Sequence, residues 1–259
     1  MATLHDPRGV FLTLLDGVTT ALGLYSLVVI AMTPDTDARL TTRLEQFGAH
    51  VVPGGKAGEG RRAGLTVAGD QPAYFSCDFD RWLHWVRFWP DELAALPERV
   101  TRLGSDKRIS PWYVCLGRTA RAFATHPAAQ RLPETATNRA LSAAAGRPLD
   151  AAAGAAWLTP EAAAIILAGS REPTAATDLE WPALILRHDP GRLRGLRCEG
   201  LEWETPDVHA EEIISAGGLA PWTRATFDTP AMWAARLRLA AASGAALERV
   251  LAGEPSIPA

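Results

Sequence analysis

The 259-residue sequence is poor in cysteine and in long apolar runs, and each shortage argues against a class of protein. The three cysteines, Cys77, Cys115 and Cys198, are odd in number and widely spaced within apolar segments. That pattern is typical of buried reduced thiols and argues against a disulfide framework or a zinc site. Because no window of about 18 residues is uninterruptedly apolar, we expect no transmembrane segment. Residues 1–8 lack a secretion signal, so we expect a soluble, cytoplasmic protein.

Lysine is almost absent, since Lys56 and Lys107 are the only two among 26 basic residues. With 29 acidic residues the formal net charge is −3, and a dedicated nucleic-acid binder would usually show a basic excess. We therefore expect no nucleic-acid partner. Hydrophobic residues make up 47% of the chain, which is enough to bury a full core.

Short apolar runs alternate with segments of helical periodicity in the first third of the chain. After a helix expected over 9–24, the strands are expected over 26–32, 50–53 and 73–77, and helices over 38–47 and 61–68. This rhythm predicts an α/β fold with a mainly parallel, Rossmann-like sheet flanked by helices.

The second half of the chain is less regular. Its expected strands cover 112–116 and 196–198, and its expected helices 134–145, 160–168, 178–187 and 230–251. We attribute the alanine-rich stretch 143–156 to composition. The pattern predicts a domain over 1–205 and a helical C-terminal extension over 206–259 that packs on it.

Two carboxylates follow the expected strand over 73–77, in the sequence Asp78-Phe79-Asp80. The carboxyl ends of parallel strands form the ligand crevice of such folds. There the pair could hold Mg²⁺ or Mn²⁺, which in turn could neutralise a diphosphate. Alternatively, Asp80 caps the helix that begins at Arg81.

A glycine-rich stretch over 54–60 precedes Arg61 and Arg62 at the start of an expected helix. Backbone N–H groups, the positive end of a helix and arginine forks together suit a phosphate group. Lys56 and Arg61 are therefore candidate donor-binding residues. The spacing matches neither the dinucleotide fingerprint nor the P-loop, and a solvated loop is the alternative.

Residues 28–80 resemble the nucleotide-sugar half of family 2 glycosyltransferases of the GT-A fold. The shared order is a strand, a Thr-Asp turn, a helix, Gly-x-x-Val, a glycine-containing loop whose arginine opens a helix, and a strand ending in Asp-x-Asp. The resemblance implies a GT-A-like fold and a nucleotide diphosphate sugar as donor. It also implies that Arg61 lies near the donor diphosphate, Asp78 near the ribose and the metal, and Asp80 on the metal.

The sequence departs from the family pattern at three places. Only residues 1–9 precede the first expected helix, so we expect the usual first strand to be absent. Ala31 and Met32 stand where the family usually has a carboxylate that contacts the base, and Arg62 replaces a common asparagine.

A second match lies at Thr177-Asp178-Leu179-Glu180-Trp181. The family places an acidic residue at the start of a helix beside the acceptor, as the base of an inverting transfer. The resemblance makes Asp178 the candidate catalytic base and Glu180 its substitute. The alternative is that the helix dipole stabilises both acids in a first turn.

Several polar and aromatic residues are weaker candidates. His209 could supply a third metal ligand, although a lone histidine is more often structural, and His84 is similar. Arg118 could bind the acceptor, and Trp181 could stack on a sugar. The remaining candidates for the crevice and for a sugar platform are Glu199, Glu202, Glu204 and Trp203. Trp82, Trp85 and Trp89 share one helix face, which favours the core.

Together these features predict a metal-dependent glycosyltransferase that moves a sugar from a nucleotide diphosphate sugar to the hydroxyl of an unknown acceptor, with inversion. The alternative is a degenerate protein that binds a nucleotide sugar or a protein partner without turnover. A phosphatase that uses Asp-x-Asp fits poorly, because Trp82 stands where that chemistry needs threonine or valine and the chain has only two lysines.

Overall fold

The fold was established from a computed structural model, which describes residues 1–105 and 109–253. Its centre is a sheet of seven strands in the order β3-β2-β1-β4-β6-β5-β7. The strands are β1 (Ala2–Leu4), β2 (Val29–Met32), β3 (His50–Pro53), β4 (Tyr74–Asp78), β5 (Tyr113–Arg118), β6 (Ala155–Leu158) and β7 (Leu193–Cys198). Neighbouring strands are parallel except at β6, which runs antiparallel to β4 and β5. The expected fold class, a mainly parallel sheet flanked by helices, is confirmed.

The prediction that the first strand is absent is wrong. β1 has only three residues, yet it lies at the centre of the sheet, where Ala2 pairs with Ile30 of β2 and with Cys77 of β4. The Met1 ammonium donates a hydrogen bond to the Phe75 carbonyl at 2.7 Å, which holds the start of the strand against β4. A segment this short carries no readable alternation of polar and apolar residues.

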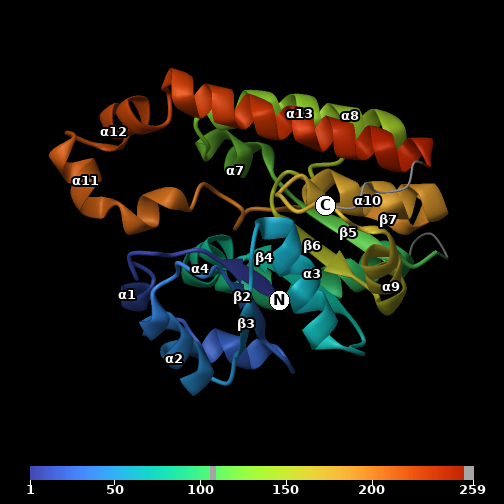
Figure 1. Cartoon of the computed structure of the whole chain (residues 1–259), viewed down its shortest axis with the longest axis horizontal. Helices are drawn as coiled ribbons and strands as arrows, with labels where there is room; N and C mark the ends of the chain where they lie inside the picture. The colour runs from blue at the N-terminus through green and yellow to red at the C-terminus, as the bar shows by residue number, and fades with distance from the viewer. Residues whose placement is uncertain (106–108, 254–259) are drawn as a thin grey trace.

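Helices cover both faces of the sheet (Figure 1). The first half contains α1 (Leu12–Leu15), η1 (Thr19–Leu24), α2 (Ala38–Gln46), α3 (Ala57–Ala68), α4 (Phe79–Phe88), α5 (Pro90–Ala94) and α6 (Leu96–Ser105). The second half contains α7 (Ala120–Thr125), α8 (Ala128–Ala145), α9 (Pro160–Gly169), α10 (Thr177–His188), η2 (Pro190–Arg192), η3 (Thr205–Val208), α11 (Ala210–Ser215), α12 (Leu219–Thr226) and α13 (Pro230–Ala252).

Two expected segments have a different structure. The helix expected over 9–24 is broken into α1 and the 3-10 helix η1, although Leu15, Val18 and Leu22 are all buried as its pattern requires. The alanine-rich stretch attributed to composition includes the start of β6. Since β6 is largely buried and starts with two alanines, it shows neither alternation nor β-branched residues, the usual marks of a strand.

The core divides into two apolar clusters, one for each face of the sheet. One contains Trp82 and Trp85 of α4, which confirms that the tryptophan stripe belongs to the core. The other contains Leu65 of α3 together with residues of α8, α9, α10 and α13. Among the described residues the three cysteines are buried and free, as the sequence predicts.

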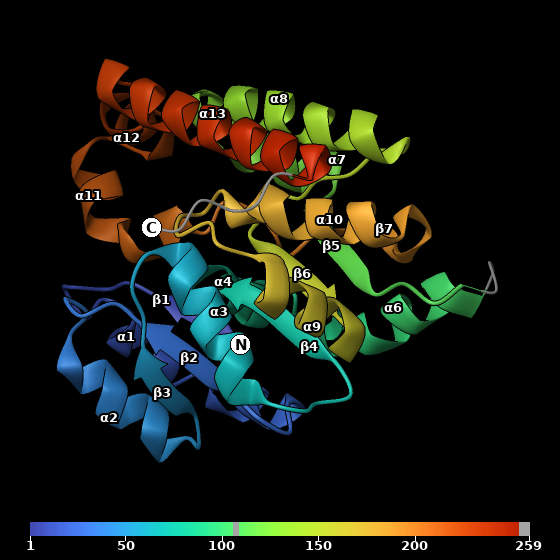
Figure 2. The same cartoon turned by 45° about the vertical axis from the view of Figure 1, so that its right-hand side comes forward.

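Helices follow the sheet at the C-terminal end of the described chain, as predicted. The long helix α13 packs on α8 and α10 and lies alongside α8 in both views (Figures 1 and 2). The boundary at residue 205 stays a prediction. Within the described ranges, no helix combines the length and the apolar character that a membrane crossing requires.

Candidate active site

Two carboxylates expected in the site meet at one buried arginine, which was expected there as well. Arg61 of α3 donates from Nη1 to Asp178 Oδ1 at 2.6 Å and from Nη2 to Asp78 Oδ1 at 2.9 Å. The same Nη1 lies 3.0 Å from Thr177 Oγ1. The Arg61 side chain is 6% exposed, whereas Asp78 and Asp178 retain 28% and 19%. The structure therefore brings Arg61, Asp78 and Asp178 together across 117 residues of sequence.

The local structure explains why both carboxylates point to the same place. Asp78 ends β4, and Thr3 of the neighbouring β1 donates a hydrogen bond to its Oδ1 at 2.9 Å. Asp178 is in the first turn of α10, where the helix dipole favours a negative charge. The short central strand thus contributes directly to the site.

Most of the glycine-rich stretch is helical instead of forming the loop that we expected before Arg61. Residues from Ala57 onward are the first turn of α3, and Glu59 Oε2 accepts a hydrogen bond from Lys56 N at 2.8 Å. Gly58 N donates to the Pro173 carbonyl at 2.9 Å, and a Cβ at Gly58 would lie 2.2 Å from the Glu172 carbonyl oxygen. The glycine therefore lets the loop before α10 dock closely on α3. Lys56 is exposed at the start of the helix.

The two carboxylates that share Arg61 have opposite pKa shifts. Burial raises the pKa of Asp178 to about 6, a rise that Arg61 opposes and the charge of Asp78 reinforces. At Asp78 burial acts in the same direction, but Arg61 and Arg81 outweigh it and hold the pKa below its usual value. Asp78 is therefore ionised at neutral pH, whereas Asp178 takes up or releases a proton at a pH just below neutral.

Asp80 is also in an acidic environment. It stands in the first turn of α4, where its Oδ1 accepts a hydrogen bond from Arg81 N at 2.8 Å. Burial, followed by the charges of Glu204 and Asp78, raises its pKa to about 7.

Asp78 and Asp80 are the candidate ligands for a divalent cation that arrives with a phosphorylated ligand. A cation would stabilise the ionised form of Asp80, which burial and its acidic neighbours disfavour. No three or more histidine, cysteine or acidic side chains of the described ranges are grouped to hold a metal ion. Magnesium, however, is commonly bound by one or two carboxylates together with substrate phosphates.

A small cavity of about 100 Å³ opens beside Asp78 and Asp178. Asp78 and Asp178 line it from the sheet edge and from α10, and Arg81 lines it from α4. Glu134 of α8 and Arg236 of α13 complete its charged lining. The helices that follow the sheet thus supply one side of the cavity.

His209 is not brought to the Asp-x-Asp pair. Its ring packs on Trp222 with the centroids 5.2 Å apart, and its Nδ1 lies 3.2 Å from Glu212 Oε1. The expected ligand set of Asp78, Asp80 and His209 is therefore not assembled in this structure.

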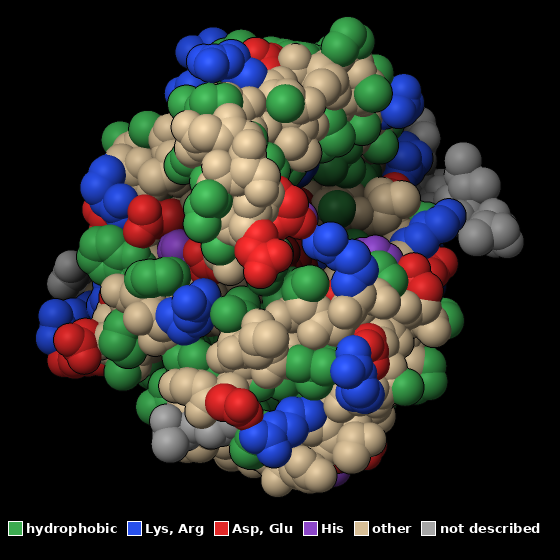
Figure 3. All heavy atoms as spheres, turned by 90° about the vertical axis from the view of Figure 1, so that its left-hand side faces the viewer, with side chains coloured by type: hydrophobic (Ala, Val, Ile, Leu, Met, Phe, Trp, Pro, Cys, Tyr) green, Lys and Arg blue, Asp and Glu red, His purple; other side chains and the backbone are tan. Residues whose placement is uncertain are grey.

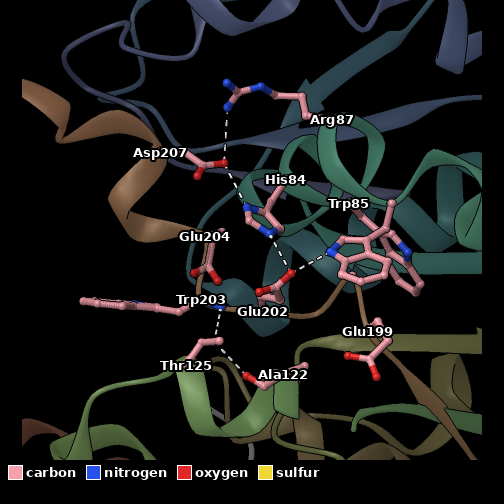
Figure 4. Close-up of polar contacts among 12 residues, drawn as sticks. His84, Trp85, Arg87, Ala122, Thr125, Glu199, Glu202, Trp203, Glu204 and Asp207 are labelled. Atoms are coloured by element: carbon pink, nitrogen blue, oxygen red, sulfur yellow. Dashed lines mark hydrogen bonds and ion pairs between the residues drawn. The ribbon is translucent and has the colours of Figure 1, made fainter. Parts of the chain in front are cut away.

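His84 has structural partners (Figure 4). Its Nδ1 lies 2.9 Å from Asp207 Oδ2, which also accepts a hydrogen bond from Arg87. On the other side of the ring, Nε2 is 3.9 Å from Glu202 Oε1. These contacts hold the segment after β7 on α4.

Three further candidates are placed in structural roles. Glu180 is buried, and its carboxylate accepts hydrogen bonds from Ser170 Oγ and from the N–H groups of residues 171 and 172. Trp181 is 2% exposed and donates to the same hydroxyl, so it offers no stacking face for a sugar. Arg118 is held by Asp150 and Glu134 with its side chain fully buried, so its guanidinium is bound within the fold.

Sequence reasoning did not identify four residues that surround the site, namely Thr3, Arg81, Glu134 and Arg236. Thr3 was missed because β1 was. Arg81 directly follows Asp80, so its position was the one available signal.

Seen from the side of α11 and α12, acidic and basic side chains gather along a band across the middle of the molecule (Figure 3).

No protein-family model matches this sequence, and no curated protein matches it. Among solved structures, it is similar to glucosyl-3-phosphoglycerate synthase from Mycobacterium tuberculosis in complex with Mn²⁺, uridine diphosphate and phosphoglyceric acid. That match has 12% identity and a TM-score of 0.46, and it covers 85% of this chain and 76% of the other. A second structure of the M. tuberculosis synthase matches at 14% identity and a TM-score of 0.42, over 84% and 80% of the two chains. Both likenesses are distant, and neither carries a residue's role over to this protein.

Proposed function

We propose that this protein is a glycosyltransferase that moves a sugar from a nucleotide diphosphate sugar to an acceptor hydroxyl. The observation that carries the proposal is the junction of Asp78 and Asp178 at Arg61, beside a cavity that both carboxylates line. This is the pair of residues that the resemblance of the sequence to GT-A glycosyltransferases assigns to the donor side and to the acceptor side.

Asp178 is the proposed general base. Its ionised form takes the proton of the acceptor hydroxyl while the hydroxyl oxygen forms a bond to the anomeric carbon. The bond from that carbon to the diphosphate breaks, and its electron pair leaves with the diphosphate. A pKa of about 6 leaves Asp178 mostly ionised at neutral pH and still basic enough to accept a proton. Attack from the face opposite the diphosphate inverts the anomeric configuration.

Arg61 is a positioning residue in this proposal, because its guanidinium already holds Asp78, Asp178 and Thr177. Asp78 and Asp80 are the proposed residues for a Mg²⁺ or Mn²⁺ ion, which when bound would stabilise charge on the leaving diphosphate. Lys56, exposed beside α3, remains a candidate contact for the donor phosphates.

A second candidate function is nucleotide-sugar binding without turnover. The bonding of Arg61 favours it, since both Nη atoms already donate to Thr177, Asp78 and Asp178 instead of to a ligand phosphate. The first strand is present as β1, so the departure that we expected there does not argue for this candidate.

Calorimetric titration with UDP- and GDP-sugars, with and without Mn²⁺, tests the donor site. We expect saturable binding that depends on Mn²⁺ and is lost in Asp80→Asn, while Asp70→Asn, an exposed change, binds as wild type does. If no nucleotide sugar binds the folded protein, the proposal fails. Binding without transfer to any of a broad set of hydroxyl acceptors supports the second candidate.

A further inference from the structure

The cavity beside Asp178 is small and is lined by charges of both signs. Its volume of about 100 Å³ is below the roughly 300–1,000 Å³ of pockets that enclose drug-sized ligands. A whole nucleotide sugar does not fit in it, but a compact polar group does. Because Asp178 lines the cavity, whatever occupies it lies next to the proposed base.

The three carboxylates that line the cavity already have close cationic partners. Asp78 and Asp178 are bound by Arg61, with Nη–Oδ distances of 2.9 and 2.6 Å. Glu134 Oε2 accepts a hydrogen bond from Arg118 Nη1 at 2.6 Å. Each of these acids therefore has a close ion-pair partner that does not line the cavity.

The two arginines that line the cavity have nearby acids, which raise the pKa of Arg81, but no acid within hydrogen-bonding distance. Arg81 is nine-tenths buried, and its Nη1 has no hydrogen-bond partner among the described residues; the nearest acid, Glu204 Oε2, is 3.8 Å away. Arg236 reaches the cavity from α13, and its nearest acid, Glu134 Oε1, lies at 3.7 Å. Both distances exceed hydrogen-bonding range. Burial lowers the pKa of Arg236, because the nearby acids do not fully offset the cost of desolvating its charged form.

We propose that Arg81 and Arg236 bind an anionic group, a carboxylate or a phosphate, on a small acceptor whose hydroxyl faces Asp178. This inference rests on the proposed transfer reaction and names its acceptor class. Guanidinium groups donate in a planar fork that matches both kinds of anion. Anchoring the anion between α4 and α13 would fix the distance from the anion to the reacting hydroxyl, so an acceptor lacking the anion would be a poor substrate.

A binding experiment without donor tests the anion site. Glycerate, inorganic phosphate and neutral glycerol are titrated onto the wild-type chain and onto Arg236→Gln. The matched control is Arg238→Gln, an exposed arginine two residues further along the same helix. We expect an anion, and not glycerol, to bind wild type and the control, and Arg236→Gln to weaken that binding about 10- to 100-fold. Which of the two anions binds tells a carboxylate site from a phosphate site.

Circular dichroism checks that each variant folds. Glycerol binding as tightly as the anions, no anion binding by wild type, or equal binding by wild type and Arg236→Gln would overturn the inference.

A second measurement adds whichever nucleotide sugar binds. Arg236→Gln should raise KM for an acidic acceptor and leave the Kd of the donor unchanged. Loss of donor affinity in this variant, with anion binding intact, would assign the arginine to the donor diphosphate and contradict the inference. If the protein binds no nucleotide sugar but binds an anion in a way that depends on Arg236, the proposed transfer reaction is wrong and the proposed anion site is supported.

Discussion

Two buried arginines in this protein are each held between two carboxylates, and only one of them belongs to the proposed active site. Arg61 binds Asp78 and Asp178, and Arg118 binds Asp150 and Glu134. The chemistry of the two clusters is nearly the same. Their difference is in how completely the carboxylates are satisfied.

In the Arg118 cluster every oxygen of Asp150 has a partner. Oδ1 accepts from Arg118 Nη2 and from Asn138, and Oδ2 accepts from Arg118 N and Nε. Although burial opposes it, these bonds hold the pKa of Asp150 below its usual value. Asp178, by contrast, accepts from the Arg61 guanidinium at one oxygen, and burial raises its pKa. A fully bonded carboxylate such as Asp150 stabilises the fold, whereas a carboxylate with an oxygen left over, such as Asp178, can accept a proton.

The largest expected effect is on catalysis. Asp178→Asn removes the proposed base while keeping the shape of the side chain, so kcat should fall about 10²- to 10⁴-fold with donor affinity retained. Transfer assays on the variant and on Asp70→Asn, an exposed control, measure it. Wild-type turnover in Asp178→Asn would remove the distinction between the two clusters.

The next effect is on stability. Arg118→Met leaves the fully bonded Asp150 as an uncompensated buried charge, so the free energy of unfolding should fall by about 3–5 kcal/mol. Arg61→Met should cost less, because Asp178 readily takes up a proton when its cation is removed. Denaturant titration of both variants measures the difference, with Arg238→Gln as an exposed control. A larger loss in Arg61→Met would invert the comparison.

A smaller effect is expected at the contact between α3 and the loop before α10. A Cβ in Gly58→Ala would lie 2.2 Å from the Glu172 carbonyl oxygen, so the loop must shift, at a cost of about 1–3 kcal/mol. Gly244→Ala in α13, which has open space at its Cβ, should be neutral or stabilising. Thermal unfolding compares the two variants. Equal stability would mean that the close approach of loop and helix is not required.

The most gradual effect is the pH dependence. Asp178 must be ionised to accept a proton and its pKa is about 6, so kcat/KM should fall about tenfold for each pH unit below that value and level off above it. The pKa of Asp150 is lowered instead, so its cluster should stay intact over the same range. A profile of kcat/KM that stays flat well below pH 6 would argue against Asp178 as the base.

The sequence was informative where the signal was local. Asp78 and Asp80 follow a buried apolar run, and Asp178 opens a helix, so both placements could be predicted from neighbouring residues. The sequence could not show that Arg61 belongs to the site and Arg118 to the fold, because the two arginines differ in the carboxylates that bind them. Asp150, for example, lies 32 residues from Arg118.

The rest of the site depends on contacts that no local pattern encodes. Arg236 stands in an alanine-rich helix whose composition gives no sign that it faces a cavity. The short strand β1 is recognisable only once β2 and β4 are present on either side of it. Likewise β6 is defined by its pairing, since its own residues could equally continue a helix.

The bond between Arg61 and Asp178 closes a loop of 117 residues. Closing a loop of that length costs chain entropy that local helix formation does not, so the two carboxylates meet only after much of the intervening chain has collapsed. During refolding, helix content should therefore recover before ligand binding does. A partly folded population of this protein would look largely native in its secondary structure and still be inert.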